Sequence, residues 1–238
     1  MMVTTASLLV LQLTTSAADG AWRAGCDDRQ LRQLDAVAAA VLTGANRFPD
    51  DSGESAASQP ARCGLAALAE LAQRGWREAR RLAPLGGDRK LLGPVNKVVE
   101  ELESLKPGPL ALEAEYAQTA VRAAVSAAQD ERPELELFLT HARDLAERLA
   151  QRGRRASWPR PFNLLAGELW LEVDRYEEAR QAYERAASVD PSPLALVGLA
   201  ESLARLDRRA ESCRAVRRVK GAEGQVLDAA QRILAACR

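Results

Sequence analysis

The sequence predicts an all-α protein, and two observations support this prediction. Ala, Leu, Arg and Glu, which favour helices, are abundant, whereas aromatic residues make up only 4% of the chain. Few stretches are rich in Val, Ile or Thr, so the chain offers little from which to build a sheet. The 238 residues are enough for one large domain or two small ones.

The N-terminal region is predicted to be helical from residue 19 to residue 107, after a leader, and a degenerate repeat around 68–83 stays an alternative within it. Apolar residues recur at helical spacing over about 28–42, 62–73, 76–83 and 94–105. A long polar stretch after Gly44 separates the first two of these helices, and Gly75 is expected to separate the second from the third. The sequence Lys-Pro-Gly-Pro at 106–109 ends the region.

The remainder, 108–238, is predicted to be a series of antiparallel helices. The apolar spacing places them at about 110–129, 133–151, 162–173, 176–189, 193–206, 208–219 and 225–236. Pro133 suits the first turn of its helix, where a backbone N–H is not needed. After residue 161 only a few residues separate successive helices, which makes antiparallel neighbours.

The first 18 residues resemble a secretory signal peptide. An apolar run covers 6–13, and small residues follow as far as Ala18, where cleavage is expected. No Lys or Arg precedes the run, so an N-terminal core helix or a tail stays an alternative. The run is too short to span a bilayer. We therefore expect a secreted or periplasmic protein without a membrane span.

Four cysteines, an even number, suit disulfides in an oxidising compartment. A long loop can bring Cys26 and Cys63 together, so we expect these two to pair. Cys213 and Cys237 are expected on successive antiparallel helices that turn near 221–224. Because a helix rises about 1.5 Å per residue, Cys237 would lie much farther from this turn than Cys213. An ideal hairpin would therefore hold the two too far apart to bond.

The segment 167–186 is echoed at 200–219. Glu168 aligns with Glu201, and Asp174-Arg175 aligns with Asp207-Arg208, with an offset of 33 residues. A two-helix unit of this length is typical of helical repeat proteins.

The first copy closely resembles a tetratricopeptide repeat. Gly167, Ala179 and Ala186 fall on that family's small positions, Trp170, Tyr176 and Tyr183 on its large ones, and Pro191 on its closing proline. A small residue at a helix crossing allows close approach, and an aromatic residue nearby fills the groove. The specific match covers about residues 160–220, and the second copy departs from the pattern at Arg209 and Val219.

The resemblance implies an α-solenoid of stacked helical hairpins, in which 110–151 are divergent repeats and 225–236 a cap. Ordinary hairpins in a bundle stay the alternative. In tetratricopeptide proteins the first helix of each repeat lines a concave groove that binds peptides. The family's groove positions correspond in this sequence to Leu164, Glu168, Leu171 and Glu172 in the first copy and to Val197, Glu201 and Arg205 in the second.

No pattern typical of an enzyme, a cofactor site or a metal site is present. The single histidine, His141, lies within a predicted helix, and the cysteines lack zinc-ligand spacing. The 33 basic and 33 acidic residues cancel, so we expect no nucleic-acid partner. A basic strip of Arg208, Arg209, Arg214, Arg217, Arg218 and Lys220 is interpreted as a solvated face, with an acidic partner as the alternative.

The sequence therefore predicts an exported, non-enzymatic interaction or scaffold protein that binds a protein or peptide. A helical accessory domain of an enzyme and a structural homo-oligomer are the alternatives.

Overall fold

The computed structural model describes residues 64–106 and 110–237, and this part of the chain is all-helical, as the composition predicts. The leader, the helix expected at 28–42 and the Cys26–Cys63 pair lie outside the described residues. The α-helices are α3 (Gly64–Leu82), α4 (Gly93–Glu103), α5 (Ala111–Ala128), α6 (Arg132–Gln151), α7 (Phe162–Glu172), α8 (Tyr176–Val189), α9 (Pro193–Arg205), α10 (Arg209–Val216) and α11 (Gly224–Ala236). Two short 3₁₀ helices, η2 (Ala83–Leu85) and η3 (Arg89–Leu91), connect α3 to α4.

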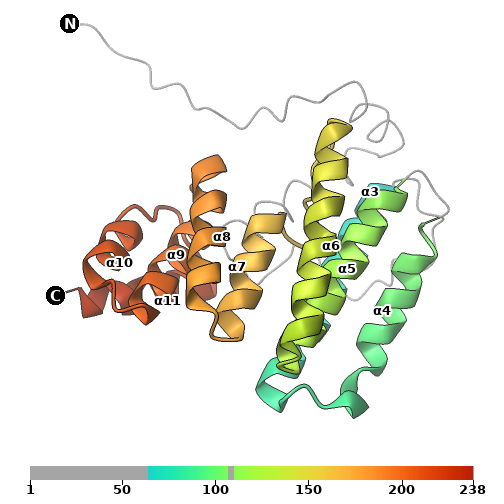
Figure 1. The fold of residues 1–238 in the computed structure, drawn as a ribbon, viewed down its shortest axis with the longest axis horizontal. Helices are drawn as coiled ribbons and strands as arrows, with labels where there is room; N and C mark the ends of the chain where they lie inside the picture. Colours follow the sequence, from blue (N-terminus) through green and yellow to red (C-terminus); the bar gives the residue numbers. More distant parts are fainter. Residues whose placement is uncertain (1–63, 107–109, 238) are drawn as a thin grey trace, which may run out of the picture.

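Helix α5 is the centre of the N-terminal half. It packs against α3, α4, α6 and α7, and most of its residues are buried (Figure 1). Small side chains allow this: Ala114, Ala117, Ala120 and Ala124 are all at most 1% exposed. Because alanine occupies little space, neighbouring helices can approach α5 from several sides.

Gly75 does not interrupt α3, so the break expected there was wrong. The helix runs unbroken from Gly64 to Leu82. A Cβ atom at Gly75 would lie 2.8 Å from Cγ2 of Val121 on α5 and 3.0 Å from Cγ1 of Val98 on α4. The glycine therefore marks a close helix crossing, where the tertiary contact outweighs the roughly 1 kcal/mol that glycine costs inside a helix.

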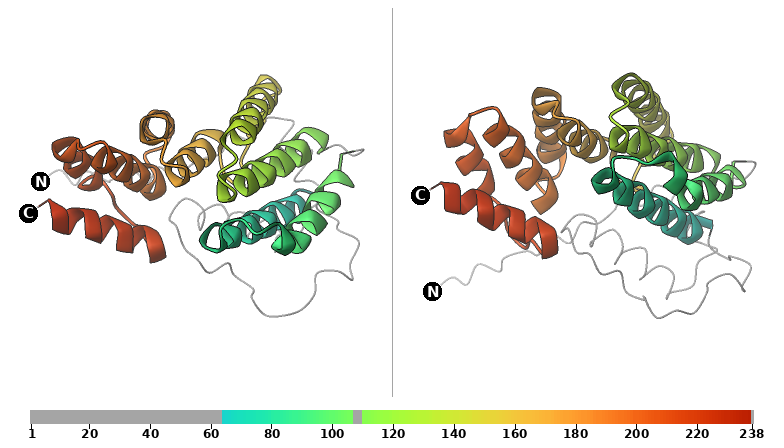
Figure 2. Two further views of the ribbon diagram at one scale, coloured as in Figure 1. Left: turned by 60° about the horizontal axis from the view of Figure 1, so that its bottom comes forward. Right: turned by 90° about the horizontal axis from the view of Figure 1, so that it is seen from below.

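The C-terminal half is a row of neighbouring helices. Contacts join α7 to α8, α8 to α9, α9 to α10, and α11 to both α9 and α10. The helix bounds agree with those expected from the sequence to within a residue or two, except that α10 ends at Val216 rather than Val219. Figure 2 shows α3 and α11 on the same side of α7 and α9.

Three turns between paired helices have the same construction. Asp130, Asp174 and Asp207, which follow α5, α7 and α9, have positive φ angles of 53°, 61° and 58°. The N–H of the next residue bonds back at 2.9 Å in each turn, from Glu131 to Ser126, from Arg175 to Trp170 and from Arg208 to Leu203. This left-handed helix end satisfies a carbonyl of the last turn, and aspartate tolerates the conformation better than most residues.

The connection 152–161 joins the two halves through buried polar contacts. The Tyr116 hydroxyl on α5 donates to the Arg160 carbonyl at 2.7 Å, and the Gln73 amide on α3 donates to the Pro159 carbonyl at 2.6 Å. Pro159 follows a cis peptide bond. These bonds hold α3, α5 and the 152–161 connection together, although the three are far apart in the sequence.

The expectation that Cys213 and Cys237 are too far apart was wrong, because they form a disulfide with a Cα–Cα distance of 5.8 Å. The prediction assumed two helices joined by a tight bend. Instead α10 stops at Val216, and the non-helical residues 217–223 carry the chain onward before α11 begins. The first three of these residues turn back onto α10, and the four that follow can span up to about 13 Å, so the end of α11 returns level with Cys213.

Candidate functional site

The side chain of Tyr183 lies between two glycines on neighbouring helices. It projects from α8 and is 2% exposed. A Cβ atom on Gly167 of α7 would lie 2.9 Å from its ring, and one on Gly198 of α9 only 2.2 Å from Cζ. Both helices therefore approach the ring more closely than any larger residue allows. Gly198 was not identified from the sequence, although a glycine within an apolar helix was the signal for it.

The other predicted packing residues differ in how deeply they are buried. Ala179 and Ala186 are 0% and 8% exposed and belong to the C-terminal core. Trp170 and Tyr176 are half-buried, with the guanidinium carbons of Arg175 and Arg205 at 5.6 and 5.7 Å from the respective ring centroids. Pro191 is exposed beyond the end of α8.

Two of the expected groove residues are inside the core. Leu164 and Val197 are 3% and 4% exposed and pack with Tyr183 in the C-terminal core. Their assignment as groove-lining residues is corrected by this burial. The two helices are packed so closely at the glycines that these positions lie beneath the surface.

Glu168 and Glu172 are each engaged by an arginine of the same chain. Arg160 Nε lies 3.0 Å from Glu168 Oε1, and Arg80 of α3 forms an ion pair with Glu172. Both carboxylate side chains are only 14% exposed. These two pairs hold α3 and the 152–161 connection against α7.

Trp76 completes this contact, which we call the α3–α7 joint and define as Gln73, Trp76, Arg80, Arg160, Glu168 and Glu172. The guanidinium carbons of Arg80 and Arg160 lie 5.7 and 5.5 Å from the Trp76 ring centroid, within cation–π range. Trp76 itself is 3% exposed. The spacing Trp76-x-x-x-Arg80, one helical turn, was the available signal in the sequence for half of the joint.

Leu171, Glu201 and Arg205 are the predicted groove residues that are accessible without breaking a close ion pair. Leu171 and Glu201 are half-buried and Arg205 is exposed. Glu201 and Arg205 approach each other at 3.9 Å on one face of α9. Helices α7 and α9 are in contact, so these residues belong to neighbouring helices. We call Leu171, Glu201 and Arg205 the α7–α9 surface.

The hydroxyl of Tyr183 lies within the electrostatic influence of two of the glutamates named above, Glu168 and Glu201. Burial, and then the negative charges of Glu168 and Glu201, raise the pKa of Tyr183 well above its ordinary value. The tyrosine is therefore neutral at physiological pH. It supplies a neutral side chain, and not a charge, beneath α7 and α9.

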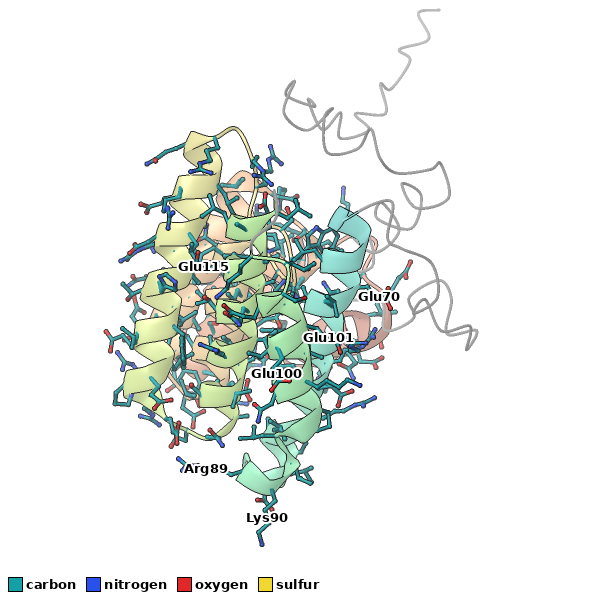
Figure 3. The ribbon with its side chains drawn as sticks, turned by 90° about the vertical axis from the view of Figure 1, so that its right-hand side faces the viewer. Glu70, Arg89, Lys90, Glu100, Glu101 and Glu115 are labelled. Carbon is teal, nitrogen blue, oxygen red and sulfur yellow. A yellow bond between two sulfur atoms is a disulfide. The ribbon has the colours of Figure 1, made fainter. Side chains whose placement is uncertain are left out.

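His141 has a structural partner on a different face. Its Nε2 lies 3.1 Å from Glu115 Oε1, and both side chains are substantially exposed. Figure 3 shows Glu115 on this face, with Glu100 and Glu101 on the neighbouring α4. Within residues 64–106 and 110–237, no three His, Cys, Asp or Glu side chains gather closely enough to hold a metal ion.

Two small hollows occur among the described residues. One of about 230 Å³ lies near Asp130, Glu172 and Asp174, where α5 and α7 end. The other, of about 220 Å³, lies between α4, α5 and α6 and is lined in part by Val95, Val99 and Phe138. Both are smaller than the roughly 300–1,000 Å³ typical of small-molecule sites.

The basic strip is partly neutralised. Arg208 pairs with Glu211 at 2.7 Å, and Arg209 donates to the Ala236 carbonyl. Arg214, Arg217, Arg218 and Lys220 are exposed and make no ion pair with a described residue. Across the part of the chain that the structure describes, no helix is long and apolar enough to cross a membrane.

No protein-family model, curated protein or solved structure matches this chain.

Proposed function

We propose that the chain is a non-enzymatic binding protein of the tetratricopeptide type that holds a protein segment on its α7–α9 surface. The observation that carries the proposal is the Tyr183 ring between Gly167 and Gly198. It ties two consecutive hairpins into one stack, with α7 and α9 side by side. The matching turns at Asp174 and Asp207 support a repeated unit.

The chemistry of the α7–α9 surface suits a peptide. Leu171 offers apolar area, Glu201 an acceptor and Arg205 a donor fork, all within two neighbouring helices. The core beneath is complete without a ligand, because Leu164, Val197 and Tyr183 fill it. Stacked helical repeats bind in this way, since their extended surface is separate from the residues that stabilise them.

Export is part of the proposal. The Cys213–Cys237 disulfide supports it, because stable disulfides are typical of oxidising compartments and rare in the cytosol. Mass spectrometry of protein purified from its native host tests this point. A mature chain that begins after Ala18 is expected, and an intact N-terminus with reduced cysteines would contradict it.

Selection from a displayed library of random peptides tests the binding function. Peptides enriched on the wild type are expected to bind a Glu201→Lys/Arg205→Glu variant at least about tenfold more weakly, measured by fluorescence polarisation. This double reversal keeps the opposite charges of the pair within α9, so the helix is expected to stay folded by circular dichroism.

Arg185→Glu on α8 is the matched control. Arg185 is exposed and makes no ion pair with a described residue, and it lies outside the α7–α9 surface. The control is expected to bind the selected peptides as the wild type does. Enrichment of no peptide, or equal loss of binding in the control, would refute the proposed surface.

A further inference from the structure

Helix α11 is the least embedded helix of the C-terminal half. Only Val226 and Ala230 of its 13 residues are buried, whereas α9, also 13 residues long, buries eight. Leu227 and Leu234 are 40% and 38% exposed. Ala229 and Ile233 are partly buried against the core, and Arg209 of α10 donates to the Ala236 carbonyl, but α11 still buries much less of itself than α9 does.

The helix also has little stability of its own. Its N-cap residue, Glu223, makes no side-chain capping bond, and its first turn contains no acidic residue. It begins with Gly224, which favours the unfolded chain. Helices of fewer than about 12–15 residues are marginal in water without tertiary contacts.

The connection to α10 does not hold α11 in place. The N–H groups of Arg217, Arg218 and Val219 bond back onto α10, but those of 220–223 donate to no described backbone carbonyl. Gly221 has a φ of 66° and nothing within 4 Å of the place where a Cβ would be. Between residues 220 and 223 only Ala222 packs against the C-terminal core, so this connection contributes little to holding α11 in place.

The Cys213–Cys237 disulfide holds the far end of α11. It joins the last turn of the helix to the middle of α10. Both cysteine residues are half-buried. Val226 and Ala230 of α11 belong to the same apolar cluster as Leu199 and Val216, which are 8% and 1% exposed.

We propose that α11 is a redox-controlled cap, which the Cys213–Cys237 disulfide locks over the end of the α9–α10 pair and which a dithiol reductant releases. The release requires no bound partner, so it is independent of the binding function proposed above.

The chemistry needs one dithiol for each disulfide. A thiolate of the reductant attacks one cysteine sulfur, and the other cysteine leaves as a thiolate that takes up a proton. The second thiol of the reductant then attacks the mixed disulfide. Cys213 and Cys237 end as free thiols, and the reductant ends as its cyclic disulfide.

Hydrogen–deuterium exchange of the full chain, with and without dithiothreitol, tests the proposal. Reduction is expected to speed amide exchange in 225–236 at least about tenfold and to leave 194–205 of α9 unchanged. A Cys26→Ser/Cys63→Ser variant removes the other two thiols and should respond in the same way. The intact mass confirms that reduction is complete.

A Cys213→Ser/Cys237→Ser variant is the matched control. Without any reductant it should exchange as fast in α11 as the reduced wild type, and dithiothreitol should not change it. Unaltered protection of α11 after complete reduction would overturn the proposal. Equal acceleration throughout α7–α10 would also overturn it, because the disulfide would then stabilise the whole stack rather than lock a cap.

Discussion

Replacing Gly198 with alanine tests whether the Tyr183 contact holds the hairpins together. An alanine Cβ at this position would lie 2.2 Å from Cζ and 2.3 Å from Cε1 of Tyr183, although ordinary contacts begin at 3.4 Å. The atoms in its way belong to a ring that is 2% exposed and is also closely approached by Gly167 of α7. Helices α8 and α9 therefore have to move apart by roughly 1 Å, which disturbs the close packing of the core.

Two opposing terms decide the magnitude. Alanine gains about 1 kcal/mol over glycine in a helix interior. Forcing extra volume into a packed core costs about 1–3 kcal/mol, and more where the backbone must shift. Because the added atom here meets a ring rather than a flexible chain end, we expect the upper part of that range. The net loss in the free energy of unfolding is then about 2 kcal/mol.

The measurement is urea denaturation, with unfolding monitored both by circular dichroism and by tryptophan fluorescence. Agreement between the two probes is needed before a single free energy is assigned, because repeat proteins can unfold in parts. A loss of this size lowers the melting temperature of a chain of this length by about 4–8 °C.

A double-mutant cycle with Tyr183→Leu isolates the contact. In the leucine background the added methyl group has room, so Gly198→Ala should be neutral or stabilising, which gives a coupling of about 2–3 kcal/mol. Gly167→Ala is the matched control, since its added Cβ would lie 2.9 Å from the same ring and should cost less. A Gly198→Ala protein as stable as the wild type, or the same penalty in both backgrounds, would refute the reasoning.

Two further predictions concern polar groups. Tyr116→Phe should lower the free energy of unfolding by about 1–2 kcal/mol, because it leaves the Arg160 carbonyl without the bond it receives at 2.7 Å; unchanged stability in urea would contradict this role. The Arg180 and Gln181 side chains hydrogen-bond to Glu177 and lower its pKa from 4.5 to about 2. Since the folded pKa lies below the unfolded one, the pair's contribution is complete above about pH 4.5 and is lost as the pH falls toward 2. NMR titration should find the Glu177 pKa raised toward its ordinary value in Arg180→Gln, and a pKa still near 2 would exclude Arg180 as the main cause.

Local patterns predicted most of the helices because they report burial directly. The bounds of α8, Tyr176–Val189, follow from its apolar spacing and the turns on each side. The error at Gly75 has the opposite origin. Helix propensity alone predicts that a glycine interrupts a helix. The reason for Gly75 is the close approach of Val98 and Val121, which only the tertiary structure shows.

The candidate surface was predicted in part. Leu171 and Glu201, which position in the repeat assigned to the groove, are half-buried, and Arg205 is exposed. Position in the repeat could not foresee that α3 brings Arg80 to Glu172, because these residues are distant in sequence and belong to no common repeat. It also placed Leu164 and Val197 on the surface, whereas the close approach at Gly167 and Gly198 buries them.

The sequence by itself determined the helical class, the order of the helices and the 33-residue echo around Asp174 and Asp207. The helical class and the order of the helices depend on residues one or two turns apart, whose periodicity is visible along the chain. The echo needs only a comparison of two stretches of the same chain. Only the tertiary structure decided how helices meet: the continuous α3, the α3–α7 joint and the Cys213–Cys237 bond. Such contacts depend on how far each connection carries the chain and on which volumes fit together, and neither quantity is local.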